Sequence, residues 1–238
     1  LNYRAHAEET GAEVPKVPAT FTKFPSCITG PFAEVALPGP TVDWEVELVA
    51  VVGRTARHVR EADAWAHIAG LTIGQDISER TLQRSGNVPQ FGLGKSYPGF
   101  GPMGPWLVTP DEFANPDDLA ISCSLNGEVM QDSRTGDLVF SVSRLIEYLS
   151  AVVPLLPGDV VVTGSQKALM LPPGLAFGQP FGPSRPEFRT VQRLRNGNRL
   201  GRKLFRLGNR QGFLNRCRLG ARFRPCGQER IPRFRDHS

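Results

Sequence analysis

The chain has 238 residues, 40% of them hydrophobic, which is enough for one sizeable core and a small appendage. It contains no apolar run near 18 residues and no secretory signal, so we expect a cytoplasmic protein without membrane spans. Leu1 lies directly in patterned sequence, so we expect the natural N-terminus to lie further upstream. The four cysteines are scattered and include no CxxC pair, which gives no support to a disulfide framework or a zinc site.

The net charge of +5 hides a division of charge along the chain. Residues 165–238 hold 17 Lys and Arg against 3 Asp and Glu, whereas residues 1–164 hold 11 against 20. An acidic body suits a metal enzyme, and a basic arm can bind nucleic acid through its phosphates. The tail contains Phe but neither Tyr nor Trp and no nucleic-acid motif, so nucleic acid is the less favoured partner.

The first 41 residues hold six prolines and predict loops and short pieces. His6 and Glu9 stand three residues apart, so a short helix would place them on one face, able to share a hydrogen bond or a water. A solvated pair is the simpler interpretation. Residues 21–24, Phe-Thr-Lys-Phe, predict a short strand.

Residues 42–53 predict a strand that carries two carboxylates into an apolar run. Side chains alternate along a strand, so Glu45 and Glu47 share a face with Val49 and Val51. Adjacent carboxylates at the end of an apolar face repel each other and resist desolvation, and a divalent cation would hold them there. The alternative is a half-exposed strand with two solvated glutamates.

The next elements are short. Local propensity and turn signals predict a helix over 61–69 that ends at Gly70, strands over 71–75, 106–109, 119–125, 128–131 and 160–164, a hairpin turn at Asn126-Gly127, and an amphipathic helix that begins at Ser141.

Asp76 begins a capping-box pattern with Glu79, so one interpretation is that it simply caps the helix that follows. In that helix, Arg80 and Gln83 lie at +4 and +7 from Asp76, and the three polar side chains share a face. A cap needs only Asp76, whereas a binding site would use all three residues.

Residues 85–105 form a long loop rich in Gly and Pro, and long ordered loops are often functional. Lys95 is its only cation, and a lone loop lysine is usually solvated. The Gly92–Ser96 stretch lacks the glycine spacing of a phosphate-binding loop.

Seven segments in this order resemble the fumarylacetoacetate hydrolase superfamily, in particular its bacterial acylpyruvase-like branch. They are Leu-Asn-Tyr-Arg-Ala-His-Ala-Glu-Glu, Asp-Trp-Glu-Val-Glu-Leu, Gln-Asp-Ile-Ser-Glu-Arg-Thr-Leu-Gln, Gly-Lys-Ser, Gly-Pro-Met-Gly-Pro-Trp-Leu-Val-Thr, Leu-Asn-Gly-Glu and Leu-Pro-Gly-Asp-Val-Val-Val-Thr-Gly. The resemblance covers residues 1–164, which it implies to be a catalytic domain truncated at its N-terminus. The implied fold is mainly β with some α, a rolled mixed β-sheet of the fumarylacetoacetate hydrolase C-terminal domain type, commonly a homodimer.

The family pattern assigns roles to nine residues of this chain. The implied ligands of one Mg²⁺ or Mn²⁺ are Glu45, Glu47 and Asp76, a hard oxygen site that these ions accept. The implied catalytic residues are His6, Glu9 and Lys95, and the implied substrate-binding residues are Arg80, Gln83 and Thr163.

The resemblance implies metal-dependent hydrolysis of a C–C bond in an acylpyruvate or related oxo-diacid, in the catabolism of small molecules. Glu9 would take a proton from a water oriented by His6, and Lys95 would face the developing oxyanion. Cleavage of the C–C bond would leave an enolate, whose charge the metal would stabilise. If no water is activated, a metal-stabilised enolate of the substrate can instead be reprotonated or lose CO₂. An isomerase, decarboxylase or hydratase acting on a 2-hydroxy-dienedioate is therefore the alternative.

After Gly164 the family's Pro-x-Gly-Val loop, Gly-Asp turn and strands do not follow. One hypothesis is a reading-frame shift near Ser165, because residues 166–170 can be encoded so that another phase gives Glu-Gly-Val-Asp after a residue compatible with Pro. We expect the Arg/Gly/Pro-rich residues 165–238 to be disordered and the fold to be incomplete at the C-terminus. The alternative for the tail is a functional basic arm. The non-enzymatic alternative for the whole chain is a poorly stable, inactive family member, because lost strands would leave sheet edges and apolar surface exposed.

Overall fold

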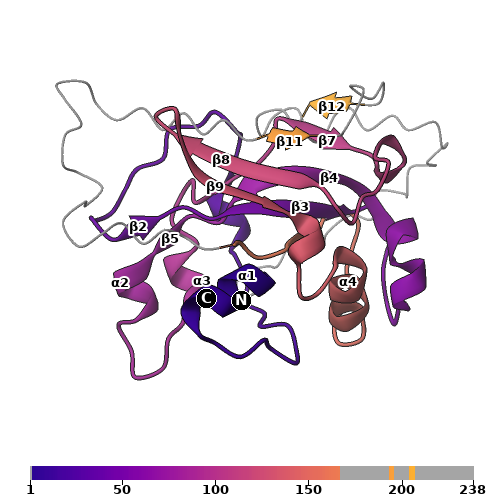
Figure 1. Ribbon diagram of the computed structural model, residues 1–238, viewed down its shortest axis with the longest axis horizontal. Helices are drawn as coiled ribbons and strands as arrows, with labels where there is room; N and C mark the ends of the chain where they lie inside the picture. Colours follow the sequence, from indigo (N-terminus) through magenta and orange to yellow (C-terminus); the bar gives the residue numbers. More distant parts are fainter. Residues whose placement is uncertain (1, 167–192, 196–203, 207–238) are drawn as a thin grey trace, which may run out of the picture.

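The computed structural model describes residues 2–166, 193–195 and 204–206 (Figure 1). The helices are α1 (Arg4–Thr10), α2 (Arg80–Gln83), α3 (Phe91–Gly94) and α4 (Val142–Ser150), with 3₁₀ turns η1 (Pro25–Cys27), η2 (Glu61–His67), η3 (Pro110–Glu112) and η4 (Thr135–Asp137). The strands are β1 (Ile28–Thr29), β2 (Val42–Asp43), β3 (Val46–Val52), β4 (Ile68–Gln75), β5 (Ser78–Glu79), β6 (Gly101–Pro102), β7 (Trp106–Val108), β8 (Ala120–Leu125), β9 (Glu128–Arg134), β10 (Val160–Val162), β11 (Arg193–Arg195) and β12 (Leu204–Arg206). The chain is thus mainly β with few helices, as predicted. Among the described residues, no helix has the length and apolar character needed to cross a membrane.

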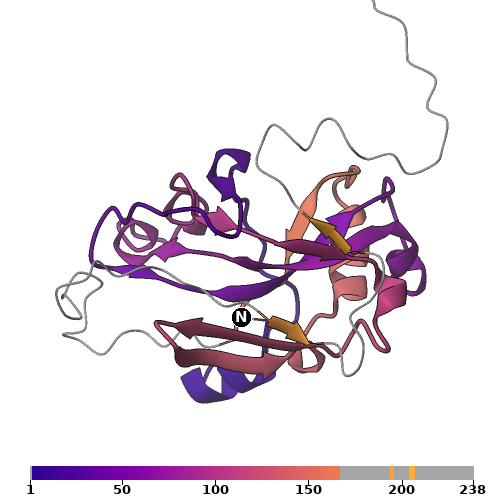
Figure 2. The same cartoon turned by 90° about the horizontal axis from the view of Figure 1, so that it is seen from above.

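Two sheets form the body of the molecule. The larger has the strand order β10-β3-β4-β7-β12, and the smaller has the order β11-β8-β9. Figure 2 shows the β8–β9 hairpin as a layer beneath the long β3–β4 pair. Two further two-stranded ribbons pair β1 with β6 and β2 with β5.

The hydrophobic core lies on one face of β3. Val46, Leu48, Ala50 and Val52 are buried in one cluster that also contains side chains of β4, β8 and α4. Alternation therefore turns Glu47 and Val49 to the opposite face of the strand, as the sequence predicted. That second face is also covered, because Glu47 and Val49 are both almost fully buried.

Helix α4 begins where the sequence predicted. The Ser141 hydroxyl accepts a hydrogen bond from the Arg144 amide at 3.1 Å, which caps the first turn. Val142, Leu145 and Ile146 of this helix are buried in the core. The helix packs against η2, on the side of the molecule away from α2 and α3 (Figure 1).

The turn residues of the β8–β9 hairpin confirm another prediction. Asn126 and Gly127 have φ angles of 52° and 90°, the left-handed values that a tight two-residue hairpin requires.

Two sequence predictions in the first half of the chain are wrong. Residues 61–67 form a 3₁₀ turn, and Gly70 lies inside β4 instead of ending a helix. A Cβ atom at Gly70 would stand 2.8 Å from the Val108 carbonyl oxygen, so the glycine serves the close approach of β7. Residues 21–24 adopt no strand: the Lys23 side chain contacts Asp76, and the Phe24 amide donates to the Ser96 hydroxyl.

The two short strands beyond residue 166 pair with the body: β11 pairs with β8, and β12 pairs with β7. The remaining residues of the tail lie outside the described residues. The predictions of disorder, of a frame shift and of a basic arm were made for residues 165–238, most of which lie outside the described residues, and they stay predictions.

Replacing Ile146 by alanine should lower the free energy of unfolding by about 2–5 kcal/mol, because the fully buried side chain would leave a cavity in the core. Urea denaturation followed by circular dichroism measures this change. The matched control is Val152→Ala just beyond the same helix, where the side chain is 80% exposed and the change should stay within about 0.5 kcal/mol. A loss in Ile146→Ala no larger than in the control would contradict the placement of α4.

Cys27 and Cys123 should react slowly with iodoacetamide at pH 8, because both thiols are buried and burial raises their pKa, that of Cys123 to about 11. Peptide-resolved mass spectrometry measures alkylation at each cysteine. The same protein unfolded in urea should be alkylated rapidly at both positions. Equal rates in the folded and unfolded protein would contradict the burial of these side chains.

Candidate metal centre and active site

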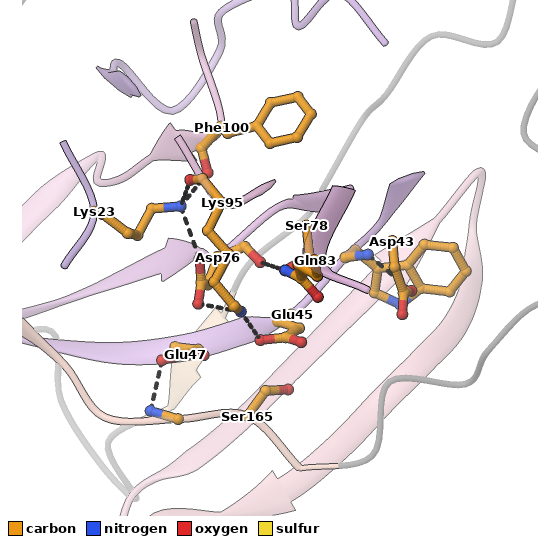
Figure 3. Close-up of polar contacts among 12 residues, drawn as sticks. Lys23, Asp43, Glu45, Glu47, Asp76, Ser78, Gln83, Lys95, Phe100 and Ser165 are labelled. Carbon is orange, nitrogen blue, oxygen red and sulfur yellow. Dashed lines mark hydrogen bonds and ion pairs between the residues drawn. The ribbon is translucent and has the colours of Figure 1, made fainter. Parts of the chain in front are cut away.

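Three carboxylates meet where β3 and β4 run side by side (Figure 3). Glu45 precedes β3, Glu47 lies in β3 opposite Gly74, and Asp76 follows β4. The Asp76 amide donates to the Glu45 carbonyl at 2.8 Å, which extends the antiparallel ladder by one step. Oxygen atoms of all three carboxylates lie within 4.8 Å of one another. The antiparallel register thus adds Asp76 to the pair that the period of the strand predicted.

Glu47 is a buried carboxylate that its two carboxylate neighbours, Asp76 and Glu45, repel. It is 2% exposed, and burial together with the charges of Asp76 and Glu45 raises the pKa of its carboxyl well above the ordinary value. The Gly164 amide donates to its Oε2 atom at 2.6 Å and partly opposes this effect. Three crowded carboxylate oxygens are the donor set of a hard divalent cation, so the residues fit Mg²⁺ or Mn²⁺.

Lys95 joins two of the carboxylates. It follows α3, and its ammonium donates to Glu45 Oε2 at 2.7 Å and to Asp76 Oδ2 at 2.5 Å (Figure 3). Burial alone would lower the pKa of Lys95, but the charges of Glu45 and Asp76 outweigh burial and raise it. The side chain is 3% exposed, so the default of a solvated loop lysine is wrong.

Arg80 contacts Glu45, one of the three carboxylates, and also Asp43, which lies outside the group. Its guanidinium contacts Glu45 Oε1 at 2.6 Å and Asp43 Oδ2 at 2.8 Å, and it donates to Gln83 Oε1 at 3.1 Å. Burial would raise the pKa of Glu45, but Lys95 and Arg80 together hold it below its ordinary value. Gln83 is 2% exposed, and its Nε2 group has no hydrogen-bond partner in the part of the chain that the structure describes. The Gln83 Nε2 group is therefore a donor that an acceptor atom from outside the protein could satisfy.

Asp76 does not cap α2, which rules out the simpler of the two interpretations of the capping-box pattern. The N-cap is Glu79, whose carboxylate accepts hydrogen bonds from the amides of Thr81 at 3.1 Å and Leu82 at 2.6 Å. The capping-box interpretation failed because the chain between Asp76 and Glu79 forms the short strand β5 before the helix begins. Asp76 is thereby left to face Glu45 and Lys95.

Lys23 is the main residue that the sequence did not single out. Its ammonium contacts Asp76 Oδ1 at 2.7 Å and the Phe100 carbonyl oxygen at 3.1 Å, and it also donates to the Lys95 carbonyl (Figure 3). These contacts reach 53 to 77 residues along the chain. A lysine in a short Phe-Thr-Lys-Phe segment carries no signal of such partners. Asp43, the second partner of Arg80, is the other omission.

Thr163 directly follows β10, and the next residue, Gly164, contacts Glu47. It is 3% exposed, and its hydroxyl and amide both donate to the Leu48 carbonyl, at 3.2 and 3.1 Å. The hydroxyl therefore anchors the turn that follows β10. Its predicted contact with substrate stays a prediction.

The candidate catalytic pair, His6 and Glu9, is only partly described. His6 lies half-buried on α1. The backbone of Glu9 belongs to the same helix, but its side chain lies outside the described residues. The catalytic roles of His6 and Glu9 stay predictions.

Comparison with known proteins gives consistent matches. A family model described as "Fumarylacetoacetate (FAA) hydrolase C-terminal" matches residues 1–192, which extends past the sequence motifs that end at Gly164. The human protein named oxaloacetate tautomerase FAHD2A, mitochondrial, is 45% identical over 177 residues, covering 74% of this chain and 54% of that protein. The 2,4-didehydro-3-deoxy-L-rhamnonate hydrolase of a Sphingomonas strain is 41% identical over 181 residues, covering 75% of this chain and 61% of that protein.

Solved structures agree with these matches. The crystal structure of 5-carboxymethyl-2-hydroxymuconate delta-isomerase from Mycobacterium smegmatis superposes with a TM-score of 0.64 at 40% identity, covering 71% of this chain and 66% of that one. The chain spans between half and two thirds of the length of the curated relatives named above. Because the family model covers most of the chain and the fold agrees, this protein belongs to the fumarylacetoacetate hydrolase family.

Proposed function

We propose that the chain binds one Mg²⁺ or Mn²⁺ ion at Glu45, Glu47 and Asp76 and acts there on a small 2-oxo acid through its enolate. The observation that carries this proposal is the convergence of three carboxylates within 4.8 Å on a buried sheet face. Burial without a cation leaves Glu47 in a repulsive position that a divalent ion would relieve. When bound, such an ion would serve as a Lewis acid for the oxygen atoms of the substrate.

The positive charges of Arg80 and Lys95 and the side-chain amide of Gln83 suit an anionic substrate. Arg80 and Lys95 bring positive charge to the rim of the carboxylate group, and both are already held in place by Glu45. The unpartnered Nε2 group of Gln83 can donate to a carboxylate or carbonyl oxygen of the substrate. Preorganised donors of this kind stabilise charge that develops on oxygen during the reaction.

Keto–enol proton transfer is the reaction that we place first. It requires the fewest groups beyond those described, because the substrate is bound, enolised and reprotonated without a second reactant. The name of the human relative, oxaloacetate tautomerase, and that of the mycobacterial isomerase support this choice.

Hydrolysis of a C–C bond in an acylpyruvate or related oxo-diacid, the reaction that the sequence predicted, is the second candidate. It needs an activated water in addition to the enolate, and His6 and Glu9 are the residues proposed for that role. The name of the Sphingomonas relative, a hydrolase, supports this candidate.

Removal of divalent metal should abolish activity. The test compares chelator-treated protein with the same protein restored with Mg²⁺ or Mn²⁺. The substrates are oxaloacetate and a panel of acylpyruvates, and the reaction is measured as the loss of their enol absorbance. Tautomerisation conserves the substrate, whereas hydrolysis yields pyruvate and a second acid that chromatography detects. Full activity in the presence of excess chelator would refute the metal-dependent proposal.

Glu47→Gln should lose the calorimetric Mn²⁺ signal of the wild type, because it removes a charged ligand from the centre of the group while keeping the shape of the side chain. Glu128→Gln is the matched control, since Glu128 is an exposed residue of β9. Equal Mn²⁺ affinity in Glu47→Gln and the control would place the ion elsewhere.

Gln83→Leu should reduce kcat/KM by about tenfold or more while Mn²⁺ affinity stays unchanged, because the change removes a substrate donor and no metal ligand. Steady-state kinetics and calorimetry measure the two quantities on the same preparation. Gln90→Leu, at an exposed position before α3, is the control and should leave both values unchanged. A parallel loss of metal affinity in Gln83→Leu would show that Gln83 supports the centre instead of the substrate.

The homodimer and the cytoplasmic location predicted from the sequence stay predictions. The human relative is named as a mitochondrial protein, which favours an organelle for that protein. Several large apolar side chains of the body are exposed, including Phe24, Phe32 and Leu93, as a protein that associates with a second copy would require.

A further inference from the structure

Asn2 is a buried residue that lies at the centre of a backbone junction. Its side-chain amide donates to the Phe140 carbonyl at 3.1 Å and to the Thr163 carbonyl at 2.6 Å. Its Oδ1 atom accepts from the Phe140 amide at 2.9 Å. Both donors and one acceptor of the side chain are therefore used to join the segment before α4 to the turn after β10.

The Thr163 carbonyl that Asn2 holds belongs to the same peptide unit as the Gly164 amide. That amide donates to Glu47 Oε2 at 2.6 Å (Figure 3). A peptide unit is planar and its C=O and N–H point in opposite directions in the trans form, so fixing the carbonyl also fixes the direction of the amide. A hydrogen bond to the carbonyl also polarises the amide and strengthens the bond that it donates.

Gly164 fits this arrangement in two ways. Its φ angle is +92°, a region that favours glycine. A Cβ atom at this position would stand 2.9 Å from the Cβ atom of Asn2. The turn and Asn2 are thus in direct contact, and the turn cannot move toward Asn2.

We propose that Asn2 is a positioning residue for Glu47, acting through the Thr163–Gly164 peptide unit. The inference rests on the proposed metal-binding role of Glu47. Without Asn2, the peptide unit loses the hydrogen bond that fixes the direction of its carbonyl, and the Gly164 amide holds less firmly a carboxylate that Asp76 and Glu45 repel. Outer hydrogen-bond partners of this type orient metal ligands and tune their affinity.

The test compares Mn²⁺ binding by calorimetry in chelator-treated wild type, Asn2→Ala and Ser150→Ala. Asn2→Ala should weaken Mn²⁺ affinity by about tenfold to a hundredfold. Ser150→Ala is the matched control, because the Ser150 hydroxyl is also buried and bonds to backbone, accepting from the Val59 amide at 3.0 Å at the end of α4. Thermal stability should fall in both variants, whereas metal affinity should fall only in Asn2→Ala.

Gly164→Ala tests the same connection from the other end: it leaves the Asn2 side chain chemically unchanged, but its added Cβ atom would stand 2.9 Å from the Asn2 Cβ atom and would displace the turn. It should also weaken Mn²⁺ affinity, and it carries the test if Asn2→Ala does not fold. Unchanged affinity in a folded Asn2→Ala or Gly164→Ala, with binding still lost in Glu47→Gln, overturns the positioning role alone. Unchanged affinity in Glu47→Gln as well overturns the proposed metal site on which it rests.

Discussion

Repulsion among buried carboxylates is the constraint on which the site depends. Three of them lie close together on and beside the paired strands β3 and β4, and Glu47 and Asp76 are almost fully buried, so their charges are poorly screened. Lys23, Arg80 and Lys95 each contact at least one carboxylate of the group, and each is contributed by a different segment. These ion pairs connect segments that are distant in the sequence, so the charge balance of the site is also part of what holds the loops against the sheet.

Glu47 differs from its two neighbours in how it is held. Lysine or arginine side chains contact Glu45 and Asp76, whereas Glu47 accepts from the backbone amide of Gly164. A backbone donor supplies direction with little compensating charge. The carboxylate that receives the least compensation is therefore the one for which an added cation would bring the largest gain.

The sequence predicted the part of the site that depends on local periodicity. Glu45 and Glu47 could be paired because a strand has a period of two, and Ser141 and Asn126-Gly127 were recognised because caps and tight turns use few residue types. The contacts of Asp76 with Glu45 depend on the register between β3 and β4, which no local pattern fixes.

The errors came from local signals that tertiary structure overrode. Asp76 carried a valid capping pattern, but β5 intervened and Glu79 became the cap. Lys95 and Lys23 resemble ordinary surface lysines in sequence, and only the three-dimensional arrangement of loops around the sheet buries them. Their burial is a property of long-range packing, so a single sequence read by pattern could identify Lys95 only through family resemblance.

The candidate metal ligands lie on or beside long paired strands, whereas Arg80, Gln83 and Lys95 lie on or just after helices of four residues. Elements of that length take their shape from caps and neighbours instead of from their own hydrogen bonds. A substitution at Gln83, which contacts none of the three carboxylates, would change a proposed substrate contact and leave the ion pairs of Arg80 and Lys95 in place. This separation offers a physical reason why one family can include proteins named as tautomerases, isomerases and hydrolases: residues beside the carboxylate group can change while the carboxylates and their ion pairs stay.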